Sequence, residues 1–196
     1  MTSKFTFLNS TQRVPADING NLPSEFSITA PPSTDIWAKP PSTFRFNAPI
    51  LYQSIHPASF KRAQVSLNAN WKDQYNQGGL ILVLNSAGEG RKWIKTGIEL
   101  THGKPHVSTV TKDRWADWSL LPIPSGGAAA TIEVVREEGN TLWIYLVEAT
   151  QKFPIREVTW AFEGIQDCWV GLYAAKPSEG EELEVNFEQA VIEVEG

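Results

Sequence analysis

Gly79-Leu80-Ile81-Leu82-Val83-Leu84 is the stretch that decides the fold, because it is a continuous apolar run of strand length. Asn85-Ser86-Ala87-Gly88-Glu89-Gly90 follows it and has the composition of a turn. After this turn, Arg91 to Leu100 alternates with a period of two residues. The alternation predicts Trp93, Lys95, Gly97 and Glu99 on one face of a strand and Ile94, Thr96, Ile98 and Leu100 on the other.

The same period recurs along the chain and predicts further strands. Ala129 to Glu137 and Thr141 to Ala149 flank Glu138-Gly139-Asn140, a pattern typical of a β-hairpin. The other strand candidates are Lys4–Leu8, Glu25–Thr29, Thr43–Phe46, Ala63–Ala69, His106–Lys112, Asp167–Ala175 and Leu183–Val194. Pro31-Pro32-Ser33 and Pro40-Pro41-Ser42 predict irregular loops around Thr34 to Lys39.

Helical periodicity is nearly absent. The chain has 13 prolines and 14 glycines, and they interrupt every window long enough to form an amphipathic helix. No repeat, low-complexity tract or shift in composition divides the chain. These features predict one all-β domain over residues 1–196, a sandwich or jelly roll of antiparallel strands.

The charge balance and the cysteine count exclude several classes of protein. Among 196 residues, 17 Lys and Arg stand against 22 Asp and Glu, a net charge of −5, whereas a nucleic-acid-binding protein needs clustered cations. Cys168 is the only cysteine, so we expect no intrachain disulfide and an inert, buried thiol. The first residues lack the apolar segment of a signal peptide, and no stretch reaches the ~20 apolar residues of a membrane span. We therefore expect a soluble, cytoplasmic protein that binds neither nucleic acid nor membrane.

The histidines do not predict a metal site. His102 and His106 are four residues apart, which on a helix would place both on one face. Gly103 and Pro105 between them predict a turn instead, so the spacing carries no such meaning. We expect no metal and no cofactor.

Three predicted strands carry aromatic residues on the face opposite their aliphatic one. These residues are Trp93 on the first strand, Trp143 and Tyr145 on the second, and Trp169 and Tyr173 on the third. If the strands are neighbours in one sheet, the rings form a continuous surface on which the apolar faces of sugars can stack. Alternatively, loops fold over this face and the tryptophans form a second hydrophobic cluster.

Five strings of residues resemble a known family. They are Thr34-Asp35-Ile36-Trp37, Ala48-Pro49-Ile50-Leu51-Tyr52, Asp73-Gln74-Tyr75-Asn76-Gln77-Gly78-Gly79-Leu80, Arg91-Lys92-Trp93-Ile94-Lys95-Thr96-Gly97-Ile98-Glu99 and Asp117-Trp118-Ser119. In this order they are similar to uncharacterised fungal and bacterial concanavalin-like proteins, a family that includes a budding-yeast protein named for the regulation of enolase. The resemblance implies a concanavalin-like jelly-roll β-sandwich of two curved antiparallel sheets, with ligands on the concave face.

The candidate ligand-binding residues come from these strings and from the aromatic strands. They are Gln74, Tyr75, Gln77, Trp93, Trp118, Trp143 and Tyr145, with Lys95 and Glu99 as candidate catalytic residues. The amides would bind hydroxyls, the rings would stack, and Lys95 would hold a carboxylate or hydroxyl oxygen. Asp35 and Trp37 are expected to form a corner motif, in which the carboxylate binds loop N–H groups and the indole plugs an edge of the core.

Three functions remain open at this point. The first is a protein that binds a small sugar-like or hydroxylated ligand on an aromatic concave face, and it predicts a cleft open to water with stacked tryptophans and no acid pair at Glu99. The second is an enzyme (a glycoside hydrolase, lyase or isomerase) with Glu99 as acid or base, and it predicts a histidine or a second carboxylate near Glu99, the carboxylate from Asp117, Asp73 or Asp35. The third is a protein-interaction module that regulates a metabolic enzyme, and it predicts a flat, wide apolar patch.

Overall fold

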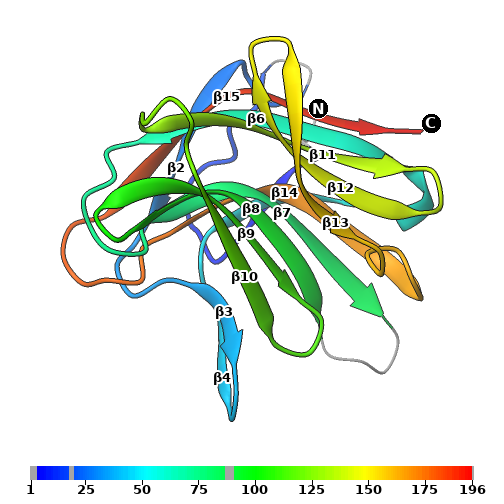
Figure 1. Ribbon diagram of the computed structural model, residues 1–196, viewed down its shortest axis with the longest axis horizontal. Helices are drawn as coiled ribbons and strands as arrows, with labels where there is room; N and C mark the ends of the chain where they lie inside the picture. The colour runs from blue at the N-terminus through cyan, green and yellow to red at the C-terminus, as the bar shows by residue number, and fades with distance from the viewer. Residues whose placement is uncertain (1–3, 18–19, 87–90, 196) are drawn as a thin grey trace.

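Two antiparallel sheets pack face to face in the computed structural model, which describes residues 4–17, 20–86 and 91–195 (Figure 1). One sheet has seven strands in the order β1-β5-β14-β7-β8-β9-β10, and the other has six in the order β13-β12-β11-β6-β15-β2. A separate two-stranded ladder pairs β3 with β4. The strands are β1 Thr6–Leu8, β2 Glu25–Ala30, β3 Ile36–Lys39, β4 Thr43–Phe46, β5 Ile50–Ile55, β6 Phe60–Ala69, β7 Gln77–Ser86, β8 Lys92–Thr101, β9 Lys104–Lys112, β10 Ala116–Pro122, β11 Ala129–Glu137, β12 Thr141–Glu148, β13 Gln151–Val158, β14 Ile165–Ala175 and β15 Leu183–Val194.

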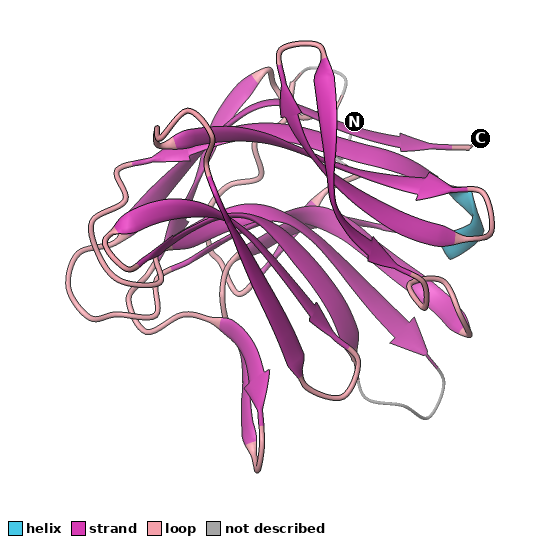
Figure 2. Ribbon diagram, in the orientation of Figure 1, coloured by secondary structure: helices cyan, strands magenta, loops and turns pink. Residues whose placement is uncertain are grey.

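Helix is limited to one short 3₁₀ turn in the described residues, Pro57–Ser59, which lies at one end of the sandwich (Figure 2). Within the same part of the chain, no helix has the length and apolar character needed to cross a membrane.

The main core fills the space between the two sheets. Leu80, Leu82 and Leu84 of β7 and Ile94 and Ile98 of β8 are buried there, on the face that the two-residue period predicts. Each such side chain contributes about 1.5–3 kcal/mol when it is removed from water. The apolar run that decides the fold is therefore a central strand.

Most strands lie where the sequence predicts them, including the hairpin of β11 and β12. The prediction of irregular loops around residues 34–39 is wrong in part, because Ile36–Lys39 pairs with Thr43–Phe46 as a short hairpin. The strands β5, β10 and β13 were not predicted either. The edge strands β10 and β13 carry Pro122 and Pro154, which edge strands tolerate. The last four residues of the predicted turn, 87–90, lie outside the described residues.

A second, smaller apolar cluster lies on the outer face of the seven-stranded sheet, the face that turns away from the six-stranded sheet. Ile81 and Val83 of β7, Trp93 of β8 and Tyr173 of β14 are buried in it. Ile36 at the start of the β3–β4 hairpin packs on them, and the hairpin extends from the sandwich on this side (Figure 1). The hairpin therefore forms a wall along one side of this otherwise open sheet face.

Candidate functional site

A cavity of about 280 Å³ lies on the outer face of the seven-stranded sheet, beside the β3–β4 hairpin. Strands β7, β8 and β10 provide its base, and the hairpin provides one wall. Its lining residues are Asp35, Trp37, Lys39, Arg45, Tyr75, Gln77, Lys95, Glu99, Trp118 and Pro177. Most of these side chains are polar or aromatic, which distinguishes the cavity from the apolar cluster next to it.

Two paired glycines lie beside Lys95 and Glu99 in the strands at the base of the cavity. Gly79 of β7 pairs with Gly97 of β8, and a Cβ atom on Gly97 would lie 2.0 Å from the carbonyl oxygen of Gly78. The strands therefore approach too closely here for any side chain. Because Gly97 stands between Lys95 and Glu99 on one face of β8, a glycine strip of buried backbone without side chains separates the two.

Lys95 is a buried lysine at the base of the cavity, with 2% of its surface exposed. Its ammonium donates a hydrogen bond to Gln77 Oε1, and the ring centroids of Tyr173 and Trp93 lie 5.6 and 5.9 Å from Nζ. Burial lowers the pKa of Lys95, while the charges of Glu99 and Asp35 act in the opposite direction. The ammonium is thus bounded by two aromatic rings and one amide oxygen.

Glu99 is the buried carboxylate at the other end of the glycine strip. Its Oε2 accepts a hydrogen bond of 2.8 Å from the hydroxyl of Ser108, which in turn accepts one of 2.9 Å from Trp118 Nε1. Burial raises the pKa of Glu99, and the charge of Lys95 and the Ser108 hydrogen bond partly offset this effect. In the described part of the chain, no donor binds Glu99 Oε1.

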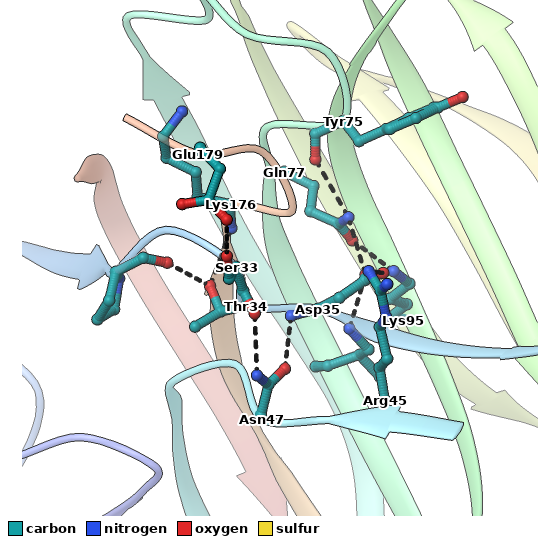
Figure 3. Close-up of polar contacts among 12 residues, drawn as sticks. Ser33, Thr34, Asp35, Arg45, Asn47, Tyr75, Gln77, Lys95, Lys176 and Glu179 are labelled. Atoms are coloured by element: carbon teal, nitrogen blue, oxygen red, sulfur yellow. Dashed lines mark hydrogen bonds and ion pairs between the residues drawn. The ribbon is translucent and has the colours of Figure 1, made fainter. Parts of the chain in front are cut away.

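Asp35 brings a second carboxylate to the cavity from the start of the hairpin. Its Oδ1 accepts hydrogen bonds from the backbone N–H of Ile36, at 2.8 Å, and from Gln77 Nε2, at 3.5 Å. Its Oδ2 lies 3.8 Å from Arg45 Nη1. Figure 3 shows this row of contacts from Arg45 through Asp35 and Gln77 to Lys95. The carboxylate thus binds one backbone N–H, that of Ile36 in β3, rather than the loop N–H groups expected of a corner motif, and it also lines the cavity.

Three aromatic side chains form the cavity wall. The ring of Trp118 meets that of Trp37 edge-on at a centroid distance of 5.9 Å, and that of Tyr75 at 6.3 Å. Tyr75 has a left-handed backbone, with φ of 69°, and its side chain is 43% exposed. Trp37 was expected to plug an edge of the core, and it packs against the smaller cluster while it faces the cavity.

The structure brings together Tyr75, Gln77, Lys95, Glu99 and Trp118 from the predicted site. Two other candidates lie nearby without lining the cavity. Trp93 is buried in the smaller apolar cluster beneath Lys95, as the alternative of a second hydrophobic cluster predicts. Gln74 is exposed, and its Nε2 donates a hydrogen bond of 3.2 Å to Thr101 Oγ1.

Trp143 and Tyr145 do not belong to this site. They lie on β12 in the six-stranded sheet, so the expectation that they share a face with Trp93 is wrong. Their rings stack at 6.2 Å, and the Tyr145 hydroxyl donates a hydrogen bond to Glu137, which together with burial raises the pKa of Tyr145 to about 12. A two-residue period identifies the face of a strand but not the sheet that the strand joins.

Of the three carboxylates proposed as partners of Glu99, Asp35 is the one that lines the cavity. Asp73 pairs instead with Lys176, and Asp117 pairs with Arg156 at 3.1 Å. Among the described residues, no group of three or more His, Cys, Asp or Glu side chains is placed to hold a metal.

The sequence analysis missed Lys39, Arg45 and Pro177. Lys39 belongs to the segment that was interpreted as a loop, whereas Arg45 lies on the predicted strand Thr43–Phe46, whose alternation was the only signal that could have oriented its side chain. Pro177 follows β14 and closes the cavity from another side.

Comparison with known proteins identifies the family. A family model described as "Protein of unknown function (DUF1349)" matches residues 13–194. The chain belongs to this family. It is 62% identical over 193 residues to "Uncharacterized protein AN7484" of Emericella nidulans, a match that covers 97% of this chain and 96% of that protein. The resemblance stated from the sequence is thus confirmed at the level of an uncharacterised family with a fungal member.

Solved structures confirm the concanavalin-like fold. A functionally unknown protein from Saccharomyces cerevisiae is similar with a TM-score of 0.79 at 22% identity, covering 98% of this chain and 97% of that one. A Mycobacterium tuberculosis protein described as a pseudo β-1,3-glucanase is similar with a TM-score of 0.56 at 12% identity, covering 100% and 96%. At these identities the likeness shows a shared β-sandwich fold and nothing further about function.

Proposed function

We propose that this protein binds a small hydroxylated, sugar-like ligand in the cavity beside the β3–β4 hairpin. The observation that carries the proposal is unused hydrogen-bonding capacity at two buried groups. An ammonium has three N–H donors, and in the described part of the chain Lys95 uses one of them, on Gln77. Glu99 Oε1 accepts none there. The free donors of Lys95 and the free acceptor of Glu99 are therefore available at the cavity, where the hydroxyls of a ligand would use both.

The walls and the size of the cavity suit a single sugar ring. Trp37, Trp118 and Tyr75 offer aromatic surface to the apolar face of a ring. The volume of about 280 Å³ is near the lower end of ligand sites, about 300–1,000 Å³. The ligand is therefore of monosaccharide size, or one unit of a longer chain.

An enzyme acting on such a ligand is the second candidate, and Asp35 favours it. Two carboxylates in one cavity, Asp35 and Glu99, match the acid pair that the enzyme hypothesis requires. Burial raises the pKa of Glu99, which suits it to donate a proton, whereas Asp35 accepts two N–H hydrogen bonds and is suited to act as base or nucleophile. The protein-partner hypothesis predicts a flat apolar patch, whereas these residues line a cavity.

Tryptophan fluorescence tests the proposal, since Trp37 and Trp118 line the cavity. The full chain is titrated with mono- and oligosaccharides and sugar acids, and the same mixtures are monitored by NMR for product. We expect a saturable change that is lost in Trp118→Ala and kept in Trp143→Ala, its control on the other sheet. No saturable change with any sugar would overturn the proposal.

The same experiment separates binder from enzyme. If product forms, Glu99→Gln is expected to abolish its formation while the fluorescence change remains, and exposed Glu138→Gln serves as the control. Equal turnover in wild type and Glu99→Gln would remove Glu99 from the mechanism. Binding without product identifies a binding module.

A further inference from the structure

The charge of the cavity differs from that of the whole chain. Lys39, Arg45 and Lys95 line it against the two carboxylates Asp35 and Glu99, so cations are in excess in a protein whose net charge is −5. A cavity with low-dielectric walls focuses the field of the charges that line it. This local excess of positive charge favours a ligand that carries negative charge.

The cations of the cavity are also incompletely paired. In the described part of the chain, no carboxylate lies within 4.0 Å of Lys95 Nζ or of Lys39 Nζ. Arg45 Nη1 lies 3.8 Å from Asp35 Oδ2, a loose contact for a guanidinium that is 55% exposed. The Asp35 carboxylate is occupied in part by the N–H groups of Ile36 and Gln77. Lys95 in particular is a buried cation whose nearest polar partner is a neutral amide.

We infer that the ligand is a sugar acid, whose carboxylate is held by Lys95 and Arg45 while its hydroxyls bind Glu99 and Gln77. The inference rests on the proposed function and names the ligand class. Such a ligand requires cations at one end of the cavity and a hydrogen-bond acceptor for hydroxyls at the other. At one end, Lys95 and Arg45 lie near Asp35 (Figure 3). At the other end, Glu99 is hydrogen-bonded to Ser108, which also binds Trp118.

The chemistry of the two ends supports this orientation. A carboxylate accepts charge-assisted hydrogen bonds from an ammonium and a guanidinium, and these are stronger than bonds to a neutral hydroxyl. The two aromatic rings beside Lys95 allow it to remain cationic in a dry site, since the ring faces attract a cation. At the opposite end, a ligand hydroxyl donates to Glu99 Oε1.

Calorimetric titration of the full chain tests the inference with matched pairs of sugars. The probes are D-glucuronate with D-glucose, D-galacturonate with D-galactose, and D-glucose 6-phosphate. We expect one acid to bind at least tenfold more tightly than its neutral parent and more tightly than the phosphate. The preference for the acid is expected to shrink in concentrated NaCl, because salt screens the partly exposed Arg45.

Variants assign the effect to the two cations. Arg45→Gln and Lys95→Met are expected to bring the affinity for the acid to within threefold of that for the neutral parent. Lys104→Met, on the exposed start of β9, should leave the preference unchanged. Arg45 is exposed, so its variant keeps the test decisive if Lys95→Met does not fold.

The outcomes separate this inference from the proposed function. Neutral sugars that bind as tightly as the acids would overturn the sugar-acid inference and leave the proposed function standing, as would a preference for the phosphate. An acid preference that survives both Arg45→Gln and Lys95→Met would also overturn it. If none of the five probes binds, the sugar-acid inference is overturned. If, in addition, no sugar of the full saccharide panel binds, the proposed function is overturned as well.

Discussion

Lys95 and Glu99 are ionisable residues that the sheet holds out of water, four residues apart on one strand face with Gly97 between them. Burial disfavours the charged form of each, so it moves their pKa values toward one another: that of Lys95 falls and that of Glu99 rises. Their mutual attraction limits both shifts. Buried groups of this kind in a cavity are characteristic of functional sites. Burial of the pair therefore costs stability at neutral pH, a cost that the proposed ligand would offset.

This residue-scale account predicts a pH-dependent gain of stability in Glu99→Gln. Because the pKa of Glu99 is higher in the folded state than in the unfolded one, its contribution to stability is complete below the unfolded pKa and is lost as the pH rises through the folded pKa. The amide of Gln does not titrate. The free energy of unfolding of the variant minus that of wild type should therefore rise from about pH 4 to neutral pH.

Urea unfolding at the two pH values measures this difference. Glu138→Gln, in the exposed turn between β11 and β12, is the matched control and should show no comparable rise. A difference for Glu99→Gln that is constant or that falls with pH would contradict the account of Glu99.

At the scale of elements, the β3–β4 hairpin completes the site. It carries Trp37 and Arg45 into the cavity and is held against the sheet by contacts to β10 and the turn before it. Phe44 stacks on Trp115 at a centroid distance of 5.1 Å, although Phe44 is 65% exposed. The contact between Phe44 and Trp115 therefore holds the β3–β4 hairpin, which forms the cavity wall, in position, and it lies outside the main core.

Phe44→Ala should consequently loosen the hairpin and leave the sandwich intact. Loss of one aromatic pair, worth about 0.5–1.5 kcal/mol, accelerates hydrogen exchange of the hairpin amides Ile36–Lys39 by roughly two- to tenfold. The midpoint of global urea unfolding should change little. Phe153→Ala removes a similarly exposed ring from β13 and serves as the control. Unchanged exchange in the hairpin, or an equal loss of global stability, would show that the Phe44 contact does not position the wall.

At the scale of the whole molecule, the apolar run of β7 and the two-residue period that recurs along the chain predicted a sandwich, and the alternation of β8 placed Lys95 and Glu99 on one face. It could not predict which strands are neighbours, and for that reason Trp143 was assigned to the wrong sheet. Asp35 and Gln77 contact one another across 42 residues of sequence. Such contacts depend on the crossing of strands in three dimensions, and a local period contains no information about them.

Cys168 offers a probe of the whole sandwich. It is buried in the main core, as the sequence analysis expected, and burial raises its pKa to about 12. A thiol reagent at mildly alkaline pH should therefore label the protein only through unfolding, because the reactive form is the thiolate. The labelling rate in increasing urea is expected to follow the unfolded fraction measured by fluorescence. Rapid, complete labelling in the absence of urea would contradict a core that is closed around β14.

The central claim is that the cavity beside the hairpin is the ligand site, and NMR of the eight tryptophan indole N–H groups tests it most directly. The ¹⁵N-labelled chain is titrated with the tightest-binding sugar of the calorimetric panel. The account predicts shifts of the Trp37 and Trp118 signals, with Trp143 on the opposite sheet unchanged. Shifts of Trp143 with Trp37 and Trp118 unchanged would place the ligand elsewhere and contradict the account.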